Sequence, residues 1–118
     1  MAAELQVDYL SGKVVYFQLR NSIGQIYNTA GAAFEAYATA NIADYDIAGT
    51  EQGTASGFYT GNMPSVAAGI YSVVAKDRLG GAPAEADISI GWGTLEWGGT
   101  VVTGLGTAYG EPSGAPPL

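Results

Sequence analysis

The sequence predicts an all-β protein, a single Greek-key β-sandwich of six to seven strands with an extension at each end. Three observations lead to this fold class. Apolar and polar residues alternate over short segments, turns recur about every ten residues, and helical patterns are nearly absent. The chain has 18 glycines among its 118 residues, enough to supply the many turns between short strands.

The first predicted strand of the sandwich covers residues 13–20, KVVYFQLR. Val15, Phe17 and Leu19 alternate with more polar residues, so we expect these three side chains to face the core. An Asn-Ser-Ile-Gly turn follows it, and the strand QIYN then returns beside the first one. Residues 20–28 are therefore predicted to form a hairpin.

Three shorter elements come next. Residues 33–38, AFEAYA, predict a strand with Phe34 inward, although the alanines leave a helical turn through residue 41 open. A further strand is expected around Ile47, and another over residues 57–63, GFYTGNM, after a turn.

The segment 64–77, PSVAAGIYSVVAKD, organises the predicted fold. Pro64 closes the preceding strand, because it cannot donate a ladder hydrogen bond. Gly69 frees the backbone where the next strand begins, and Tyr71 and Val73 lie on the face that we expect to be buried. A tyrosine after such a corner is typical of the tyrosine corner of β-sandwiches. A buried aromatic on any strand would give the same pattern.

The last long strand is predicted over residues 87–97, DISIGWGTLEW, after a glycine-proline loop. A β-bulge near residues 91–93 would turn all its large apolar side chains to one side. Without a bulge, one tryptophan is buried and the other is exposed. The apolar residues concerned change parity along the strand: Ile88, Ile90 and Trp92, then Leu95 and Trp97. Residues 101–102 are expected to begin a short further strand.

These elements divide the chain into an N-terminal arm (1–12), the sandwich (13–103) and a Gly/Pro-rich tail (104–118) that cannot join a sheet interior. The arm is predicted to be a short edge strand or an extension that lies on a neighbour. The expected core residues are Val15, Phe17, Leu19, Phe34, Ile47, Tyr59, Tyr71 and Val73. The expected interface residues, on the two extensions, are Leu5, Val7, Tyr9, Leu10, Pro116, Pro117 and Leu118.

Composition excludes several classes of function. The net charge is −7 with four cations, too few to neutralise a run of phosphates, so we expect neither nucleic acid nor an anionic membrane as a partner. The chain has no Cys and no His, which removes disulfides, Ser-His-Asp and Cys-His catalysis and the commonest metal ligand. The N-terminus lacks the basic and apolar regions of a signal peptide, so we expect synthesis in the host cytoplasm without one.

Carboxylates are the remaining groups that could carry chemistry. Asp44, Asp46 and Glu51 could offer oxygen ligands to Ca²⁺. Asp44 with Asp46, or Glu85 with Asp87, could act as an acid–base pair only in a cleft that shifts one pKa. Solvated loop carboxylates are the simpler interpretation, so the sequence predicts no catalytic residue, no metal and no cofactor.

Four segments in this order carry a resemblance: VVYFQL before an Asn-x-x-Gly turn, GFYTG before Met-Pro, GIYSVV, and a strand ending in LEW. Together they resemble the small immunoglobulin-like or prealbumin-like β-sandwich modules of bacteriophage virion and bacterial surface proteins. The resemblance covers roughly residues 13–97. It implies a fold and a virion or surface setting, and it implies no catalytic residues.

The function expected is therefore that of a non-enzymatic structural protein of a bacteriophage virion, such as a capsid decoration or other accessory protein. Its partners would be other copies of itself and a capsid or tail protein. A hydrophobic content of 47% with only 13% charged residues favours a surface that neighbours partly cover. The alternative is a carbohydrate- or receptor-binding module of a tail fibre or cell-surface protein, with Trp92 and Trp97 as stacking residues.

Overall fold

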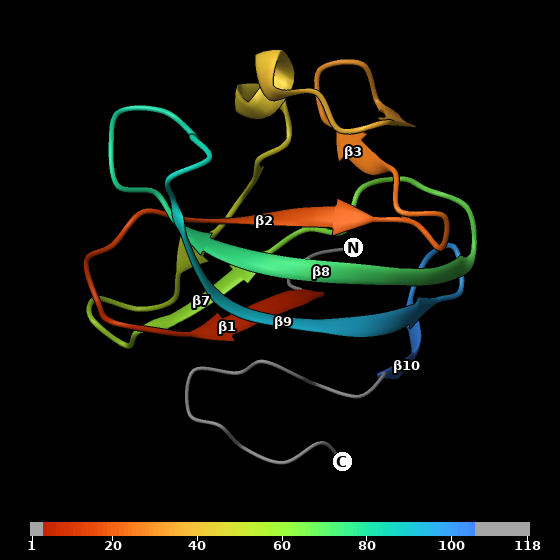
Figure 1. The fold of residues 1–118 in the computed structure, drawn as a ribbon. Helices are drawn as coiled ribbons and strands as arrows, with labels where there is room; N and C mark the ends of the chain where they lie inside the picture. Colours follow the sequence, from red (N-terminus) through yellow and green to blue (C-terminus); the bar gives the residue numbers. More distant parts are fainter. Residues whose placement is uncertain (1–3, 106–118) are drawn as a thin grey trace.

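The computed structural model describes residues 4–105, which form two antiparallel sheets packed face to face (Figure 1). The larger sheet contains β2 (Val15–Arg20), β3 (Ile26–Asn28), β4 (Ala33–Glu35), β5 (Ile47–Ala48), β8 (Gly69–Asp77), β9 (Ile88–Trp97) and β10 (Val102–Leu105). The smaller sheet contains β1 (Leu5–Asp8), β6 (Thr50–Glu51) and β7 (Phe58–Gly61). The predicted all-β sandwich is confirmed.

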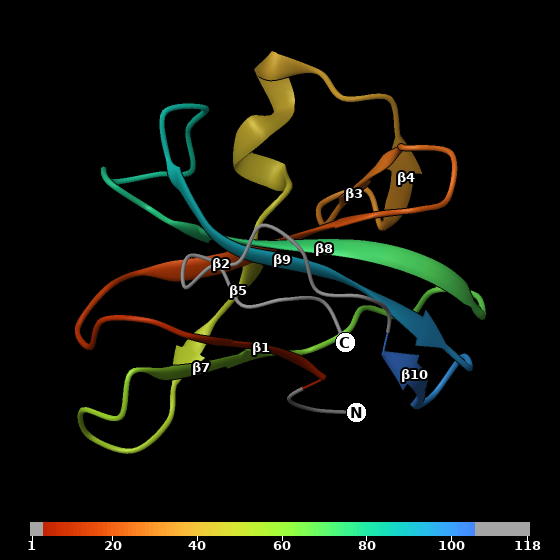
Figure 2. The same cartoon turned by 60° about the horizontal axis from the view of Figure 1, so that its bottom comes forward.

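The larger sheet has the strand order β10-β9-β8-β2-β3-β4, with β5 also paired to β2, and the smaller sheet has the order β1-β7-β6. Figure 2 shows β1 and β7 side by side below the long strands. The immunoglobulin-like Greek key remains a prediction, because these strand orders do not establish it.

The segment predicted as AFEAYA contains a strand that is shorter than expected. Strand β4 ends at Glu35, and a six-residue 3-10 helix, η1 (Thr39–Asp44), follows it. Within residues 4–105 this is the only helix, and it is far shorter than the roughly 20 residues that a bilayer span needs.

Strand β1 agrees with the first of the two alternatives predicted for the N-terminal arm, a short edge strand, over the described residues of that segment. It pairs with β7 over its whole length, from Leu5 opposite Gly61 to Asp8 opposite Phe58. Leu5 is only 2% exposed, so it belongs to the core of its own chain and is not available as an interface residue. The sandwich therefore includes β1, before the predicted boundary at residue 13, and β10 continues past the boundary at 103.

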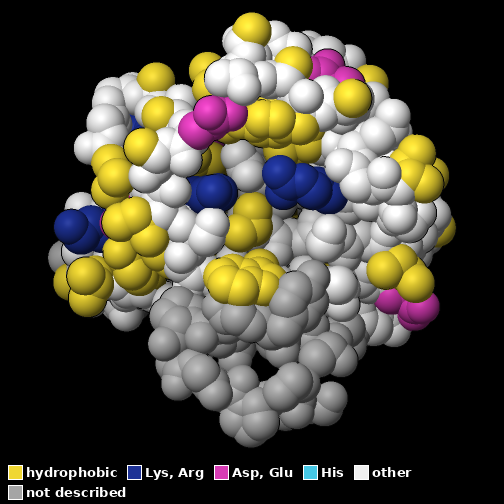
Figure 3. Space-filling model, in the orientation of Figure 1, with side chains coloured by type: hydrophobic (Ala, Val, Ile, Leu, Met, Phe, Trp, Pro, Cys, Tyr) yellow, Lys and Arg dark blue, Asp and Glu magenta, His cyan; other side chains and the backbone are white. Residues whose placement is uncertain are grey.

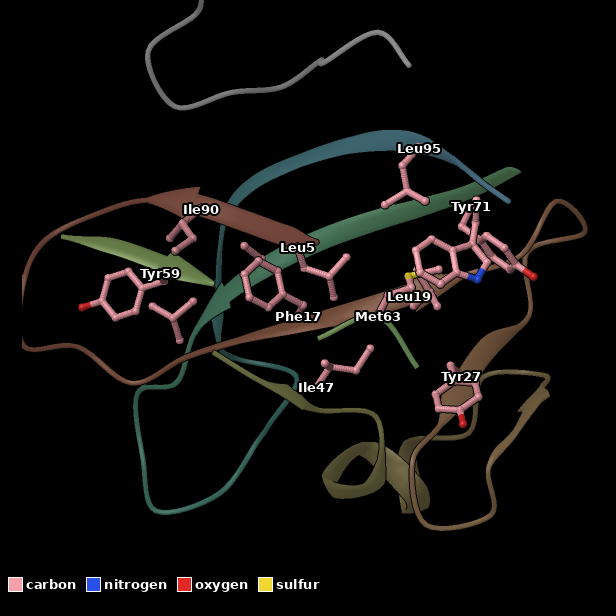
Figure 4. Close-up of a cluster of buried hydrophobic side chains, with 13 residues drawn as sticks. Leu5, Phe17, Leu19, Tyr27, Ile47, Tyr59, Met63, Tyr71, Ile90 and Leu95 are labelled. Atoms are coloured by element: carbon pink, nitrogen blue, oxygen red, sulfur yellow. The ribbon is translucent and has the colours of Figure 1, made fainter. Parts of the chain in front are cut away.

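The core lies between the two sheets, where side chains from both layers meet (Figure 4). Of the eight predicted core residues, six are buried, and the other two, Phe34 and Val73, are partly buried and packed against them. Phe34 stacks on Tyr71 with ring centroids 5.6 Å apart. The core members that were not on the predicted list are Leu5, Tyr27, Met63, Ala75, Ile90, Leu95 and Trp97.

Strand β8 has the predicted phase, with Tyr71 and Ala75 buried. The Tyr71 hydroxyl donates a hydrogen bond of 2.5 Å to the carbonyl oxygen of Ala67, four residues upstream. A tyrosine near the start of a strand that bonds back to the preceding backbone is the arrangement of a tyrosine corner. It ties the turn before β8 to the strand itself.

Strand β9 contains a bulge, but its effect differs from the prediction. Ala75 pairs with Gly91 and the next residue of β8 pairs with Ser89, so Ile90 is the extra residue. The bulge brings Ile90 to the same side as the buried Leu95 and Trp97. It does not bury all five apolar residues there. Ile88, opposite the buried Asp77, lies on that side but is 49% exposed at the start of the strand, and Trp92 is half-buried on the opposite face.

Candidate functional site

The outer face of the larger sheet, opposite the core, carries a groove of about 220 Å³ over β2, β8 and β9. We call it the outer groove. Its lining residues are Gln18, Arg20, Ser72, Val73, Val74, Lys76, Ser89 and Trp92. Figure 3 looks onto this face and shows Lys or Arg side chains on two sides of a hollow, with hydrophobic atoms between and below them.

Strand register explains how these residues meet. Val74 of β8 lies opposite both Gln18 of β2 and Trp92 of β9. Directly paired residues share a face of the sheet, so these three side chains form a row across the floor of the outer groove. Gln18 is buried, at 3% exposure, whereas Val74 and Trp92 are half-buried.

The two cations of the outer groove lie at its opposite ends. Arg20 is paired with Ser72, which is four residues before Lys76 on β8. At about 3.3 Å per residue this separates them by about 13 Å along the strands. Two of the four cations in the whole sequence line this one groove. Within residues 4–105 neither is joined to a carboxylate by an ion pair, so the groove is locally cationic on an acidic protein.

A buried phenol–carboxylate pair lies beside the Lys76 end of the groove, because Tyr16 of β2 is paired with Lys76. The Tyr16 hydroxyl donates to Asp87 Oδ2 at 2.5 Å, and Asp87 also accepts the backbone N–H groups of Leu79 and Ala84. Burial opposes ionisation of Asp87, but these hydrogen bonds outweigh it and lower its pKa. Burial and the bond to Asp87 raise the pKa of Tyr16. The loop before β9 is thus fixed over β2.

A second polar cluster fixes η1 to its surroundings. The Tyr45 hydroxyl donates to Glu35 Oε2 at 2.6 Å, and Asn41 donates to the same oxygen at 2.9 Å. These bonds lower the pKa of Glu35. Glu85 accepts hydrogen bonds from the hydroxyls of Tyr37 and Thr39, the latter at 2.9 Å.

The candidate carboxylates of the sequence analysis do not converge. Glu85 and Asp87 bind different partners in separate clusters. Glu51 accepts the backbone N–H groups of Gly12 and Gly57, which closes a turn of the smaller sheet. The described part of the chain contains no group of three carboxylates placed to hold a metal ion. Glu51, Glu85 and Asp87 act as structural hydrogen-bond acceptors. Burial, with a smaller contribution from Asp44, raises the pKa of Asp46.

One end of the sandwich carries exposed apolar side chains, which we call the end patch. Its members are Leu10 (62% exposed), Val14 (47%), Leu79 (57%) and Ile88 (49%). They belong to segments that meet where β2 and β9 begin and β8 ends: Val14 O accepts the Arg78 N–H at 2.8 Å. Figure 3 shows hydrophobic side chains gathered at this left-hand end of the molecule.

The predicted site residues have different positions. Leu5 is in the core, Val7 and Tyr9 pack against it, and Leu10 is exposed in the end patch. Pro116, Pro117 and Leu118 lie outside the described residues.

The two tryptophans do not form one stacking platform. Trp97 is buried and donates its Nε1–H to Val66 O at 3.1 Å, while Trp92 lines the outer groove. Their five-residue spacing already indicated different faces of a strand. Sequence reasoning missed the role of Arg20 and Lys76, because their relation depends on the pairing of β2 with β8.

Comparison with protein-family models, with curated proteins and with solved structures found no match to this chain.

Proposed function

We propose that this chain is a non-enzymatic structural protein, an immunoglobulin-like sandwich module that serves as a bacteriophage virion component such as a capsid decoration or other accessory protein. The observation that supports this best is the end patch: four large apolar side chains are exposed at one end of a domain with few charges. Exposed apolar surface of this kind is typical of protein–protein contact sites.

The expected partners are other copies of the chain and a capsid or tail protein. The absence of His and Cys from the sequence, and the structural hydrogen bonds of Asp87 and Glu51, support a role without catalysis. The net charge of −7 would keep the free protein soluble and repel anionic surfaces.

The test has two parts. Light scattering after size-exclusion chromatography measures the mass of the purified chain and of the variant Leu79→Asp. An oligomeric parent chain and a monomeric variant would support assembly through the end patch. Virus particles are then purified on a density gradient from the organism or sample in which the sequence occurs. Mass spectrometry searches the particle fractions for peptides of the chain. Their absence from the particle fraction would contradict the virion role.

A second candidate function is that of a carbohydrate- or receptor-binding module. The outer groove favours it, because a half-buried tryptophan lies there beside hydroxyl, amide and cationic side chains. Ligand sites combine apolar or aromatic surface with a few placed polar groups in this way.

A further inference from the structure

We propose that the outer groove binds an acidic saccharide, with Arg20 and Lys76 selecting its carboxylate or sulfate groups and Trp92 stacking on a sugar ring. This inference rests on the second candidate function and names its ligand class. It holds whether or not the chain belongs to a virion.

Charge gives the first argument. Neither Arg20 nor Lys76 forms a close ion pair among residues 4–105, although the charge of Lys76 helps to lower the pKa of the nearby Asp87 carboxyl. The Arg20 guanidinium can therefore pair with an incoming anion, and Lys76 adds a second positive charge. A guanidinium presents two parallel N–H donors to a carboxylate or sulfate, and an ammonium adds a point charge. With 11 acidic residues against four cations, the chain as a whole repels an anionic ligand. Attraction is therefore concentrated in the groove that two of those cations line, one at each end.

The groups between the cations match a sugar. Trp92 brings an aromatic ring to the lining of the groove, and aromatic side chains of this kind pack on the C–H side of sugar rings. The hydroxyls of Ser72 and Ser89 and the amide of Gln18 each donate and accept hydrogen bonds, as sugar hydroxyls require. This mixture suits a ligand that carries anionic, hydroxyl and apolar surfaces at once.

The site is built on strands. Among residues 4–105, the lining residues come from β2, β8 and β9, which are paired along most of their lengths. Binding then requires little ordering of the backbone, which reduces its entropic cost. The volume of about 220 Å³ is below the usual range for enclosed small-molecule pockets. An open groove of this size fits a short stretch of a longer glycan.

Two other classes of anion fit less well. Nucleic acids need a longer run of cations than two residues supply. Extended peptides commonly bind by pairing with a sheet edge, whereas the strands below the outer groove already have neighbours on both sides.

Isothermal titration calorimetry tests the inference with three probes: a galacturonate tetrasaccharide, its neutral methyl ester and a glutamate tetrapeptide. We expect the acid to bind, and the ester and the peptide to bind at least tenfold more weakly. Arg20→Gln, Lys76→Gln and Trp92→Ala should each weaken binding of the acid at least fivefold. Lys13→Gln, which removes an exposed cation outside the groove, should not change it. Circular dichroism confirms that each variant is folded.

The outcomes separate the inference from the function on which it rests. Equal binding of the acid and the ester would overturn the selection of charge and leave saccharide binding in place. Binding that survives Arg20→Gln and Lys76→Gln but not Lys13→Gln would place the site elsewhere and overturn the inference. Equal binding of the peptide would overturn the ligand class. If neither the acid, nor hyaluronan and heparin fragments, bind at millimolar concentration, both the inference and the second candidate function fail.

Discussion

Gly61 of the smaller sheet lies directly against the ring of Phe17 in the larger sheet. A Cβ built at this position would lie 2.8 Å from Cδ2 of the Phe17 ring, which is itself 1% exposed and packed on all sides. The ring cannot move away without disturbing the core, because interiors are close-packed. The absence of a side chain at Gly61 therefore sets the distance between the layers.

We predict that Gly61→Ala lowers the free energy of unfolding by about 1–3 kcal/mol, as overpacking of a core does. Gly80→Ala is the matched control, since nothing lies within 4 Å of its added Cβ and its φ is not positive. Urea unfolding followed by circular dichroism measures both. Equal stability of the two variants would show that the core accommodates the methyl group.

Tyr71 combines two contributions that substitutions can separate. Tyr71→Ala removes a buried ring that stacks on Phe34 and should lower the free energy of unfolding by about 3–5 kcal/mol. Tyr71→Phe keeps the ring and removes the hydrogen bond to Ala67 O, so it should lower it by about 1 kcal/mol. A loss below about 1 kcal/mol for Tyr71→Ala would contradict the position of this residue in the core.

At the scale of elements, local sequence predicts which residues of a strand face the core better than it predicts which strand pairs with which. In β8, the alternation of Tyr71, Val73 and Ala75 was sufficient to predict the buried face, because every second residue of a regular strand lies on the same side. In β1 the same alternation was recognised, but burial of Leu5 depends on pairing with Gly61, more than 50 residues away. An edge strand and a free arm have the same local pattern, so sequence reasoning could not choose between them.

We predict that Leu5→Ala lowers the free energy of unfolding by about 2–5 kcal/mol. Leu10→Ala, at a residue 62% exposed, should change it by less than about 0.5 kcal/mol. Deleting residues 1–12 should leave the chain unfolded by circular dichroism, since it removes β1 and uncovers the β7 edge. A folded deletion variant would revive the interpretation of this segment as a dispensable arm.

At the scale of the whole molecule, the distribution of pKa shifts limits the pH range of stability. Hydrogen bonds lower the pKa of Glu35, Glu51 and Glu85, and they outweigh the effect of burial on Asp87. A carboxyl with a lowered folded pKa stabilises the fold above its unfolded value near 4, and this contribution is lost as pH falls. Burial raises the pKa of Asp46, so ionisation of this carboxyl destabilises the fold as pH rises and partly offsets the contribution of the others.

Tyrosines set the alkaline limit. Burial and the bond to Asp87 raise the pKa of Tyr16 well above its ordinary value of 10.0. Its stabilising contribution is complete below that unfolded value and is lost as pH rises beyond it, because the unfolded chain ionises first. The other tyrosines with a raised pKa are Tyr9, Tyr37, Tyr45 and Tyr71.

We therefore predict a plateau of stability between about pH 5 and pH 9, with losses on both sides. Tyr16→Phe should be less stable than the parent chain at pH 7, because Asp87 loses a hydrogen bond. Between pH 7 and pH 11, however, its free energy of unfolding should fall less than that of the parent. Urea unfolding at a series of pH values checks this, and parallel losses in both proteins would contradict the role of Tyr16.

The outer groove is also a property of the whole molecule. Alternation alone placed Gln18 and Arg20 on one face of their strand and Ser72 and Lys76 on one face of another. Only the pairing of β2 with β8, and of β8 with β9, brings these residues and Trp92 together. The bulge lies at Ile90, one to three residues before the predicted residues 91–93, because glycines tolerate a bulge without specifying which residue is extra.

The position of the two tryptophans in β9 has an optical consequence. Trp97 is 4% exposed in the core, whereas Trp92 is half-buried in the outer groove. Their emission should therefore separate into a blue-shifted component shielded from iodide and a red-shifted component that iodide quenches. In a single titration the first component would report unfolding and the second would report occupancy of the groove, so the chain carries its own pair of reporters without a label.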